Sequence, residues 1–163
     1  MARFEDPTQR PYKLPDLSTT LNIPLHDIRI NCVFCKGELQ EREVFEFAFN
    51  DLFIVYRDCT PYAACLKCIS FYARVRELRY YRDSVYGETL EAETKTPLHE
   101  LLIRCYRCLK PLCPTDKLKH ITEKRRFHNI AGIYTGQCRG CRTRARHLRQ
   151  QRQARSETSE TLV

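Results

Sequence analysis

The sequence predicts the α+β class, with two small four-cysteine units in tandem, a linker helix between them and a disordered basic tail. A repeated cysteine pattern, short segments of both helical and strand periodicity, and an arginine-rich end predict this organisation. The chain has 163 residues, 10 cysteines and a net charge of +8. Each half is so short that its apolar core alone would be marginal, so cross-links are expected.

The cysteines supply these cross-links. Two groups each contain two Cys-x-x-Cys pairs separated by 29 residues, namely Cys32, Cys35, Cys65 and Cys68, then Cys105, Cys108, Cys138 and Cys141. Each member of the second group follows its counterpart by 73 residues. Equal spacing of this kind indicates an internal duplication.

The spacing favours a structural zinc ion in each unit. Two thiolates two residues apart face one ion from a tight turn, and a second pair completes a tetrahedral shell. Four soft thiolates select zinc over magnesium or calcium, with an iron–sulfur cluster as the alternative. The 36 residues between the groups favour one ion per repeat over cross-braced pairing. Cys59 and Cys113 have no cysteine at the 73-residue offset and are expected to be thiols outside the sites.

Several functional classes are not expected. No apolar stretch approaches the ~18 residues of a membrane span, and the first residues lack the apolar core of a secretory signal. Without export, ten cysteines are not expected to form disulfides, because the cytosol keeps thiols reduced. The five histidines form no spaced pair, and neither a nucleophile elbow nor a phosphate loop occurs, so an enzyme is not expected.

Apolar periodicity and turn residues predict the elements in chain order. Residues 1–13 are expected to be a flexible arm. Residues 14–80 form the first zinc domain, with a helix over 14–25 capped by Asp16, a strand over 28–33, a helix over 38–49, a buried strand over 52–56 and the start of the linker helix over 69–82. Residues 81–97 are a linker of helical composition. Residues 98–144 form the second zinc domain, with a strand over 101–105, a helix over 115–125 capped by Thr115 and strands over 127–134. Residues 145–163 are expected to be disordered.

Four stretches resemble the papillomavirus early protein six family, in its high-risk mucosal branch. They are EVFEFAFNDLFIVYRD (43–58), RELRYYRDSVYG (76–87), KRRFHNIAG (124–132) and the terminal ETLV. The resemblance implies a non-enzymatic viral adaptor oncoprotein of the host nucleus and cytoplasm. It would bind a Leu-x-x-Leu-Leu helix of a host HECT ubiquitin ligase and redirect that ligase to degrade the fifty-three-kilodalton tumour suppressor.

The resemblance also implies the residues that carry this activity. An apolar peptide groove, with arginines at its rim, would be lined by Val33, Phe34, Leu52, Phe53, Val55, Ala64, Ile69, Tyr72, Arg79 and Arg104. Ordinary core packing is the alternative for each apolar member. Phe49 and Asp51 would contact the tumour suppressor, although an exposed Phe49 also suits self-association.

Two features of the C-terminal region suggest further partners. The last four residues, Glu160, Thr161, Leu162 and Val163, fit strand addition to a PDZ domain, with the terminal carboxylate held by backbone amides. The segment 139–155 carries seven arginines and no acidic residue. This segment suits nuclear import or weak DNA binding. A zinc-finger-like, DNA-binding transcriptional regulator is therefore the alternative function.

Overall fold

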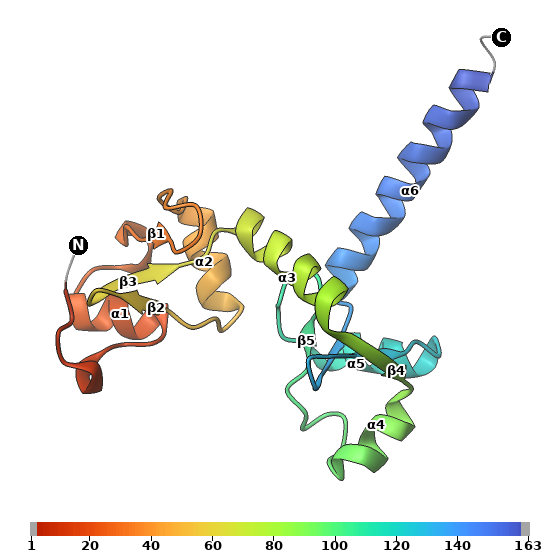
Figure 1. Cartoon of the computed structure of the whole chain (residues 1–163), viewed down its shortest axis with the longest axis horizontal. Helices are drawn as coiled ribbons and strands as arrows, with labels where there is room; N and C mark the ends of the chain where they lie inside the picture. Colours follow the sequence, from red (N-terminus) through yellow and green to blue (C-terminus); the bar gives the residue numbers. More distant parts are fainter. Residues whose placement is uncertain (1–2, 161–163) are drawn as a thin grey trace. The chain divides into compact units, whose positions relative to one another are not determined.

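The computed structural model describes residues 3–160, with side chains described through Arg155. The chain divides into two compact units between Val75 and Arg76, inside helix α3 (Leu66–Tyr80) (Figure 1). The division lies within the linker helix, a few residues before the expected domain end at residue 80. Among the described residues, no helix combines the length and the apolar character that crossing a membrane requires.

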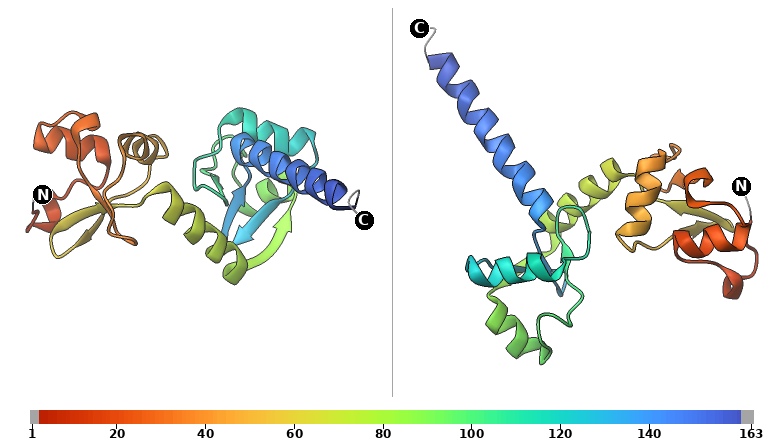
Figure 2. Two further views of the ribbon diagram at one scale, coloured as in Figure 1. Left: turned by 90° about the horizontal axis from the view of Figure 1, so that it is seen from above. Right: turned by 180° about the vertical axis from the view of Figure 1, so that it is seen from behind.

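The first unit is a three-stranded sheet with helices packed on it. Its elements are the 3-10 helix η1 (Pro7–Gln9), α1 (Leu14–Leu21), the 3-10 helix η2 (Leu25–Asp27), β1 (Asn31–Cys32), α2 (Glu41–Phe49), β2 (Val55–Arg57), β3 (Thr60–Ala63) and the start of α3. The strand order is β1-β3-β2, with β1 parallel and β2 antiparallel to β3. Helices α1 and α2 lie beside each other against this sheet (Figure 2), where Leu14, Leu17, Val44 and Phe47 are buried.

The N-terminal arm contacts the first unit over its described residues. The Phe4 amide donates to the Cys59 carbonyl at 2.8 Å, and the Ile54 amide donates to the Tyr12 carbonyl at 2.8 Å. The rings of Phe4 and Tyr12 each meet the Tyr56 ring edge to face. These aromatic side chains hold the described part of the expected arm against the β2–β3 hairpin.

Three details of the expected elements are wrong. Lys13, not Asp16, caps α1, and Cys113, not Thr115, caps α5. A proline directly follows the first residue of α1 and another begins α5, as suits the first turn of a helix, so both N-caps lie earlier than expected, although α1 begins at residue 14 as predicted. The apolar run 52–56 is not a buried strand: β2 begins only at Val55, and Phe53 is 60% exposed while Ile54 is buried.

The second unit is a four-stranded sheet in the order β4-β6-β7-β5. Its elements are β4 (Tyr81–Val85), α4 (Gly87–Thr94), β5 (Arg104–Cys105), α5 (Pro114–Thr122), β6 (Phe127–Ile130), β7 (Ile133–Gly136) and α6 (Arg139–Glu160). Strand β4 was expected to be linker, but it pairs antiparallel with β6 as an edge strand. Its charged sequence hides the strand, because an edge exposed to solvent needs little apolar alternation.

The tail is the clearest departure from expectation. Residues 145–160, expected to be disordered, continue helix α6 without a break (Figure 1). Beyond Gly140 this segment contains no glycine or proline, and it is rich in arginine, glutamine and alanine. These residues have high helix propensity even where they bury nothing.

The backbone repeats the 73-residue offset of the cysteines. Lys36 and Leu109, each directly after the second cysteine of its group, have left-handed φ angles of 63° and 61°. The isolated bridge between residues 31 and 38 recurs between residues 104 and 111. The internal duplication predicted from the cysteines is thus visible in the local conformation of each unit.

Candidate metal centres

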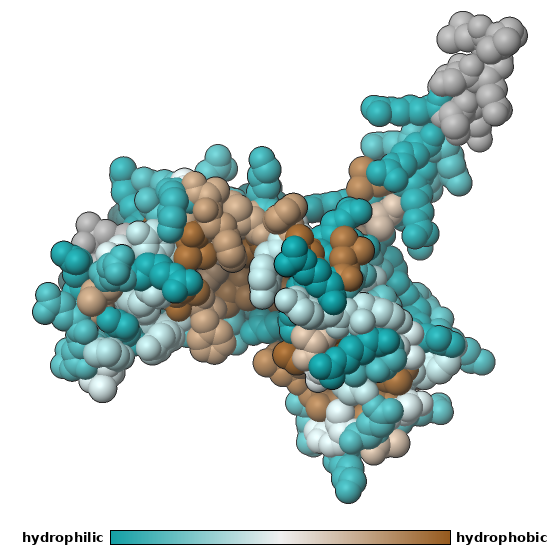
Figure 3. All heavy atoms as spheres, in the orientation of Figure 1, coloured by the Kyte–Doolittle hydropathy of each residue, from teal (hydrophilic) through white to brown (hydrophobic). Residues whose placement is uncertain are grey.

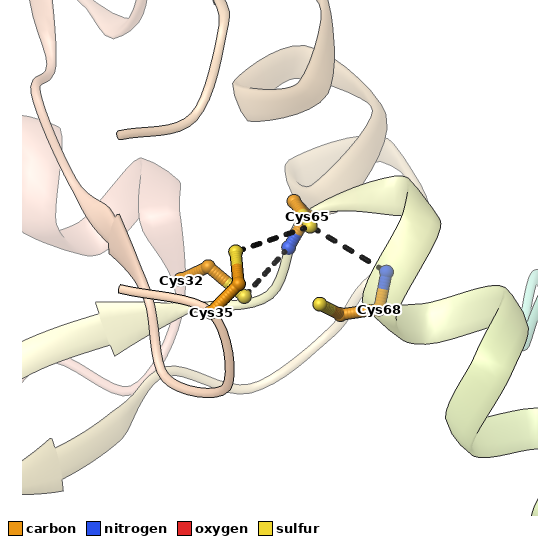
Figure 4. A group of neighbouring side chains, drawn as sticks. All are labelled: Cys32, Cys35, Cys65 and Cys68. Carbon is orange, nitrogen blue, oxygen red and sulfur yellow. Dashed lines mark hydrogen bonds between the residues drawn. The ribbon is translucent and has the colours of Figure 1, made fainter. Parts of the chain in front are cut away.

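The first group of cysteines converges on one point in the first unit. Cys32 ends β1 and Cys35 follows in the turn, while Cys65 precedes α3 and Cys68 lies in its first turn (Figure 4). The four sulfur atoms all lie within 4.8 Å of one another, and the Sγ atoms of Cys35 and Cys65 are 3.9 Å apart. The parallel pairing of β1 with β3 brings the two Cys-x-x-Cys pairs together.

The second unit repeats this arrangement. Cys105 ends β5, which pairs in parallel with β7, and α6 begins directly after Cys138. The sulfur atoms of Cys105, Cys108, Cys138 and Cys141 again lie within 4.8 Å of one another, and those of Cys108 and Cys138 are 3.8 Å apart. The sequence prediction of one complete group per repeat is confirmed as a spatial grouping.

The geometry of both groups fits a tetrahedral ion. A tetrahedron with metal–sulfur bonds of about 2.3 Å has sulfur–sulfur edges of about 3.8 Å. The sulfur–sulfur distances of 3.9 and 3.8 Å match this value. They are far longer than the ~2.05 Å of a disulfide bond, and all ten cysteines are free thiols. Each group can therefore hold one metal ion that prefers sulfur ligands.

Backbone amides point at these sulfur atoms. The amide of Cys65 donates to the Cys32 sulfur at 3.4 Å, and the amide of Cys138 donates to the Cys105 sulfur at 3.5 Å. The amide of Arg107 also donates to the Cys105 sulfur, at 3.4 Å. Donors around ligating atoms fix their orientation and stabilise the thiolate form.

The thiols also influence one another's ionisation. Burial raises the pKa of Cys32, but the amides of Cys65, Cys35 and Phe34 outweigh this effect and lower the pKa to about 6. The hydrogen bond with Cys65 raises the pKa of Cys68 to about 12. One thiolate thus forms readily while a neighbour keeps its proton, because like charges at this distance repel. A divalent cation would allow all four to ionise.

Neither remaining cysteine belongs to these groups. Cys59 lies in the turn between β2 and β3 with a left-handed φ of 64°, and its sulfur accepts from the Arg10 guanidinium at 3.5 Å. Cys113 is exposed at the start of α5. The position 73 residues after Cys59 is Gly132, which adopts the same left-handed conformation.

Comparison with known proteins now identifies the family. The profile of the family described as Early Protein (E6) matches residues 7–141. The chain belongs to the E6 family. Protein E6 of human papillomavirus type 18 is 66% identical to it over 96% of this chain and 99% of the relative, and Protein E6 of human papillomavirus 45 is 61% identical over the same shares.

One solved structure extends the comparison. It is the C-terminal zinc-binding domain of the HPV51 oncoprotein E6, which is 55% identical and covers 41% of this chain and 87% of its own, with a TM-score of 0.37. The resemblance to the papillomavirus early protein six family is confirmed, and the α+β class with two four-cysteine units agrees with the fold seen here.

The residues expected to line a peptide groove fall into different environments. In the first unit, Phe34, Phe53, Val55 and Tyr72 are exposed, and Figure 3 shows apolar surface gathered over α2 and the start of α3. The Phe34 and Tyr72 rings stack with their centroids 6.0 Å apart. Ile69 is buried at 5% exposure, whereas the remaining apolar members are half-buried, namely Val33, Leu52 and Ala64. In the second unit Arg79 is exposed, and Arg104 donates to the Leu109 carbonyl at 3.0 Å.

The other expected contact residues lie at the surface or beyond it. Phe49, at the end of α2, is 82% exposed. Asp51 adopts a left-handed φ of 52° and accepts from the Lys13 ammonium at 2.6 Å. Glu160 is the last residue of α6, and Thr161, Leu162 and Val163 lie outside the described residues.

His120 is a buried polar residue that no sequence motif marks as part of the site. It lies in the last turn of α5, and its ring stacks on Phe127 with centroids 4.4 Å apart. Its Nε2 accepts from the Gln137 amide at 3.1 Å, one residue before Cys138. The duplication offers a sequence signal for this burial. The residue 73 positions before His120 is Phe47, which lies in the core of the first unit.

We expect His120 to make the second unit sensitive to acid. Burial lowers the pKa of His120 below its ordinary value of 6.5, so the unfolded chain takes up this proton before the folded chain does. Its contribution to stability is complete above pH 6.5 and declines as the pH falls below that value, until the folded-state pKa is passed. Urea unfolding with excess zinc at a series of pH values measures this slope. The variant His120→Phe should show a smaller slope, and an identical slope would contradict the assignment.

Proposed function

We propose that this chain is a zinc-dependent adaptor rather than an enzyme. Two zinc ions hold the units folded, and the apolar surface binds a Leu-x-x-Leu-Leu helix of a host HECT ubiquitin ligase. The loaded chain then brings the ligase to the fifty-three-kilodalton tumour suppressor, and its terminus brings PDZ-domain proteins. This proposal rests on one observation: the chain combines two complete four-cysteine groups with exposed aromatic side chains in its first unit.

Zinc is the ion that best suits the thiolate groups. Four sulfur ligands at tetrahedral spacing fill the coordination shell of zinc and leave no position for a substrate. Such sites stabilise folds and do not catalyse reactions.

The exposed aromatic residues of the first unit support peptide binding. Phe34, Phe53 and Tyr72 present large apolar areas to solvent, which a surface without a partner rarely keeps together. The Lys13 ammonium lies 3.5 Å from the centre of the Phe53 ring while it pairs with Asp51. An amphipathic helix binds such a surface through apolar anchors, and nearby cations favour an acidic one. Arg79 and Arg104 would add positive charge.

The remaining partners rest on exposure and on the terminal sequence. Phe49 and Asp51 stand at the end of α2, and a side chain as exposed as Phe49 suits contact with the tumour suppressor or self-association. The terminal residues 160–163 suit a PDZ domain, whose pocket takes an apolar last residue. We place these activities in the host nucleus and cytoplasm.

A titration calorimeter tests peptide binding. The full zinc-loaded chain should bind an acidic Leu-x-x-Leu-Leu peptide with a Kd on the order of micromolar. Leu52→Glu should abolish binding by placing a charge against the apolar anchors, and Arg104→Glu should abolish it by reversing a charge. The zinc content of both variants should stay at the wild-type value.

A matched control separates this surface from a general effect of added charge. Leu148→Glu introduces the same charge at an exposed leucine of α6, outside the predicted set, and should bind the peptide normally. Normal binding by both Leu52→Glu and Arg104→Glu would contradict the proposal.

One observation favours DNA binding as a second candidate. The seven arginines of residues 139–155 are carried on helix α6, which arrays cations along a rod suited to a phosphate backbone. Affinity for duplex DNA that falls steeply with salt, together with sequence preference and no peptide binding, would favour a transcriptional regulator.

A further inference from the structure

In the first unit, the Glu43 carboxylate joins the starts of two helices. Glu43 lies in the first turn of α2, and its Oε2 accepts from the Gln40 amide at 3.1 Å. Its Oε1 accepts from the Leu66 amide, also at 3.1 Å. Leu66 is the first residue of α3 and stands between the ligating cysteines Cys65 and Cys68. One side chain therefore ties α2 to the helix start that carries half of the thiolate group.

The second unit makes the same connection with a different residue. Asp116 lies in the first turn of α5, and its Oδ1 accepts from the Arg139 amide at 2.9 Å. Arg139 is the first residue of α6 and stands between Cys138 and Cys141. Asp116 follows Glu43 by 73 residues and Arg139 follows Leu66 by 73 residues, so the duplication has kept both ends of the bond.

Because Asp116 is buried, loss of its hydrogen bond with the Arg139 amide would cost free energy. Asp116 is only 7% exposed, and a carboxylate that is buried to this extent requires strong hydrogen bonds. The first amides of a helix have no partner within the helix, and a carboxylate there also complements the helix dipole. The carboxylate and the helix start thus satisfy each other.

The position of the helix start decides the position of two sulfur atoms. The amide of Cys68 donates to the Cys65 sulfur at 3.5 Å, and the amide of Cys141 donates to the Cys138 sulfur at 3.5 Å. The third and fourth thiolates of each group are therefore built into the first turn of a helix. A shift of that turn would move both of them away from tetrahedral spacing.

We propose that Glu43 and Asp116 are positioning residues of the two metal centres. Each carboxylate anchors the helix start that carries the third and fourth thiolates, and so raises the metal affinity of its own group. This inference rests on the proposed zinc binding. Four thiolates and one zinc ion carry a net negative charge, which repels a carboxylate, so the gain comes from the hydrogen bond and not from the charge.

This distinction sets the design of the variants. Glu43→Gln removes the charge and keeps one oxygen acceptor, which can serve the Leu66 amide in place of Oε1, whereas Glu43→Leu keeps most of the volume and removes both acceptors. Zinc affinity is measured on the full chain by competition with a chelator, while NMR amide signals of each unit report its own centre. Loss of an orienting group around metal ligands typically lowers affinity about 10–100-fold.

For Glu43→Leu we expect zinc affinity to fall about 10–100-fold at the first centre and to stay at the wild-type value at the second. Asp116→Leu should give the reverse pattern, and Glu43→Gln should stay close to wild type at both centres. The cobalt-substituted chain should show a changed sulfur-to-cobalt absorption for Glu43→Leu. The control Glu46→Leu lies on the same helix, where Glu46 pairs with the exposed Arg42 at 3.0 Å, and should leave both centres unchanged.

Two results would overturn the inference. One is unchanged zinc affinity and cobalt absorption at the first centre of Glu43→Leu. The other is an equal loss at both centres, which would indicate general destabilisation. A wild-type chain that binds fewer than two zinc ions would instead refute the proposed function, so the two failures are distinguishable.

Discussion

Replacing Cys108 with serine is expected to unfold the second unit while the first stays folded. Structural zinc contributes an apparent folding free energy of about 10–16 kcal/mol in small zinc domains. The whole stability of an ordinary domain is only about 5–15 kcal/mol, so a unit of this size has little left without its ion. In Cys108→Ser, NMR amide signals of the second unit should collapse to random-coil positions and zinc content should halve.

The same substitution at a cysteine outside the groups provides the control. Cys113→Ser alters an exposed thiol at the start of α5 and should leave the spectrum and the zinc content unchanged. A Cys108→Ser chain with a dispersed second unit and two bound zinc ions would show that this thiolate is not a ligand.

The second large effect is expected at Phe127. This residue is 0% exposed in a core cluster with Leu90, Ile103 and Leu112, and its ring stacks on His120. Truncation to alanine leaves a cavity among groups that the sheet holds in place, which typically costs about 3–5 kcal/mol. Urea unfolding of Phe127→Ala with excess zinc should show this loss in the transition of the second unit.

An exposed phenylalanine supplies the comparison. Phe49 is 82% exposed, so Phe49→Ala removes the same atoms without making a cavity. Its free energy of unfolding should stay within about 0.5 kcal/mol of wild type. Equal losses for the two variants would contradict the assignment of Phe127 to the core.

The sequence predicted the metal groups well because their signal is chemical and periodic. The ligand spacing is the same in both units, and the parallel pairings β1–β3 and β5–β7 place the pairs as the duplication implied. The same 73-residue offset pairs Glu43 with Asp116, and their shared role became clear only from the bonds to Leu66 and Arg139. Such bonds join segments that are 23 residues apart, which periodicity cannot detect.

The errors have local physical causes. Strand β4 lacks apolar alternation because it is an edge strand, and its pairing with β6 is a tertiary contact. The polar composition of residues 1–13 predicts a flexible arm, whereas Phe4 and Tyr12 pack on Tyr56 through contacts that composition does not reveal. In α6, helix propensity prevailed over the charge and low hydropathy that suggested disorder.

Native mass spectrometry of the full chain tests the central claim most directly, because it counts the metal ions on a folded protein. We expect one dominant species that carries two zinc ions and releases them with unfolding when a strong chelator is added. A folded species that holds one ion or none, and keeps its charge-state distribution in the chelator, would contradict the account.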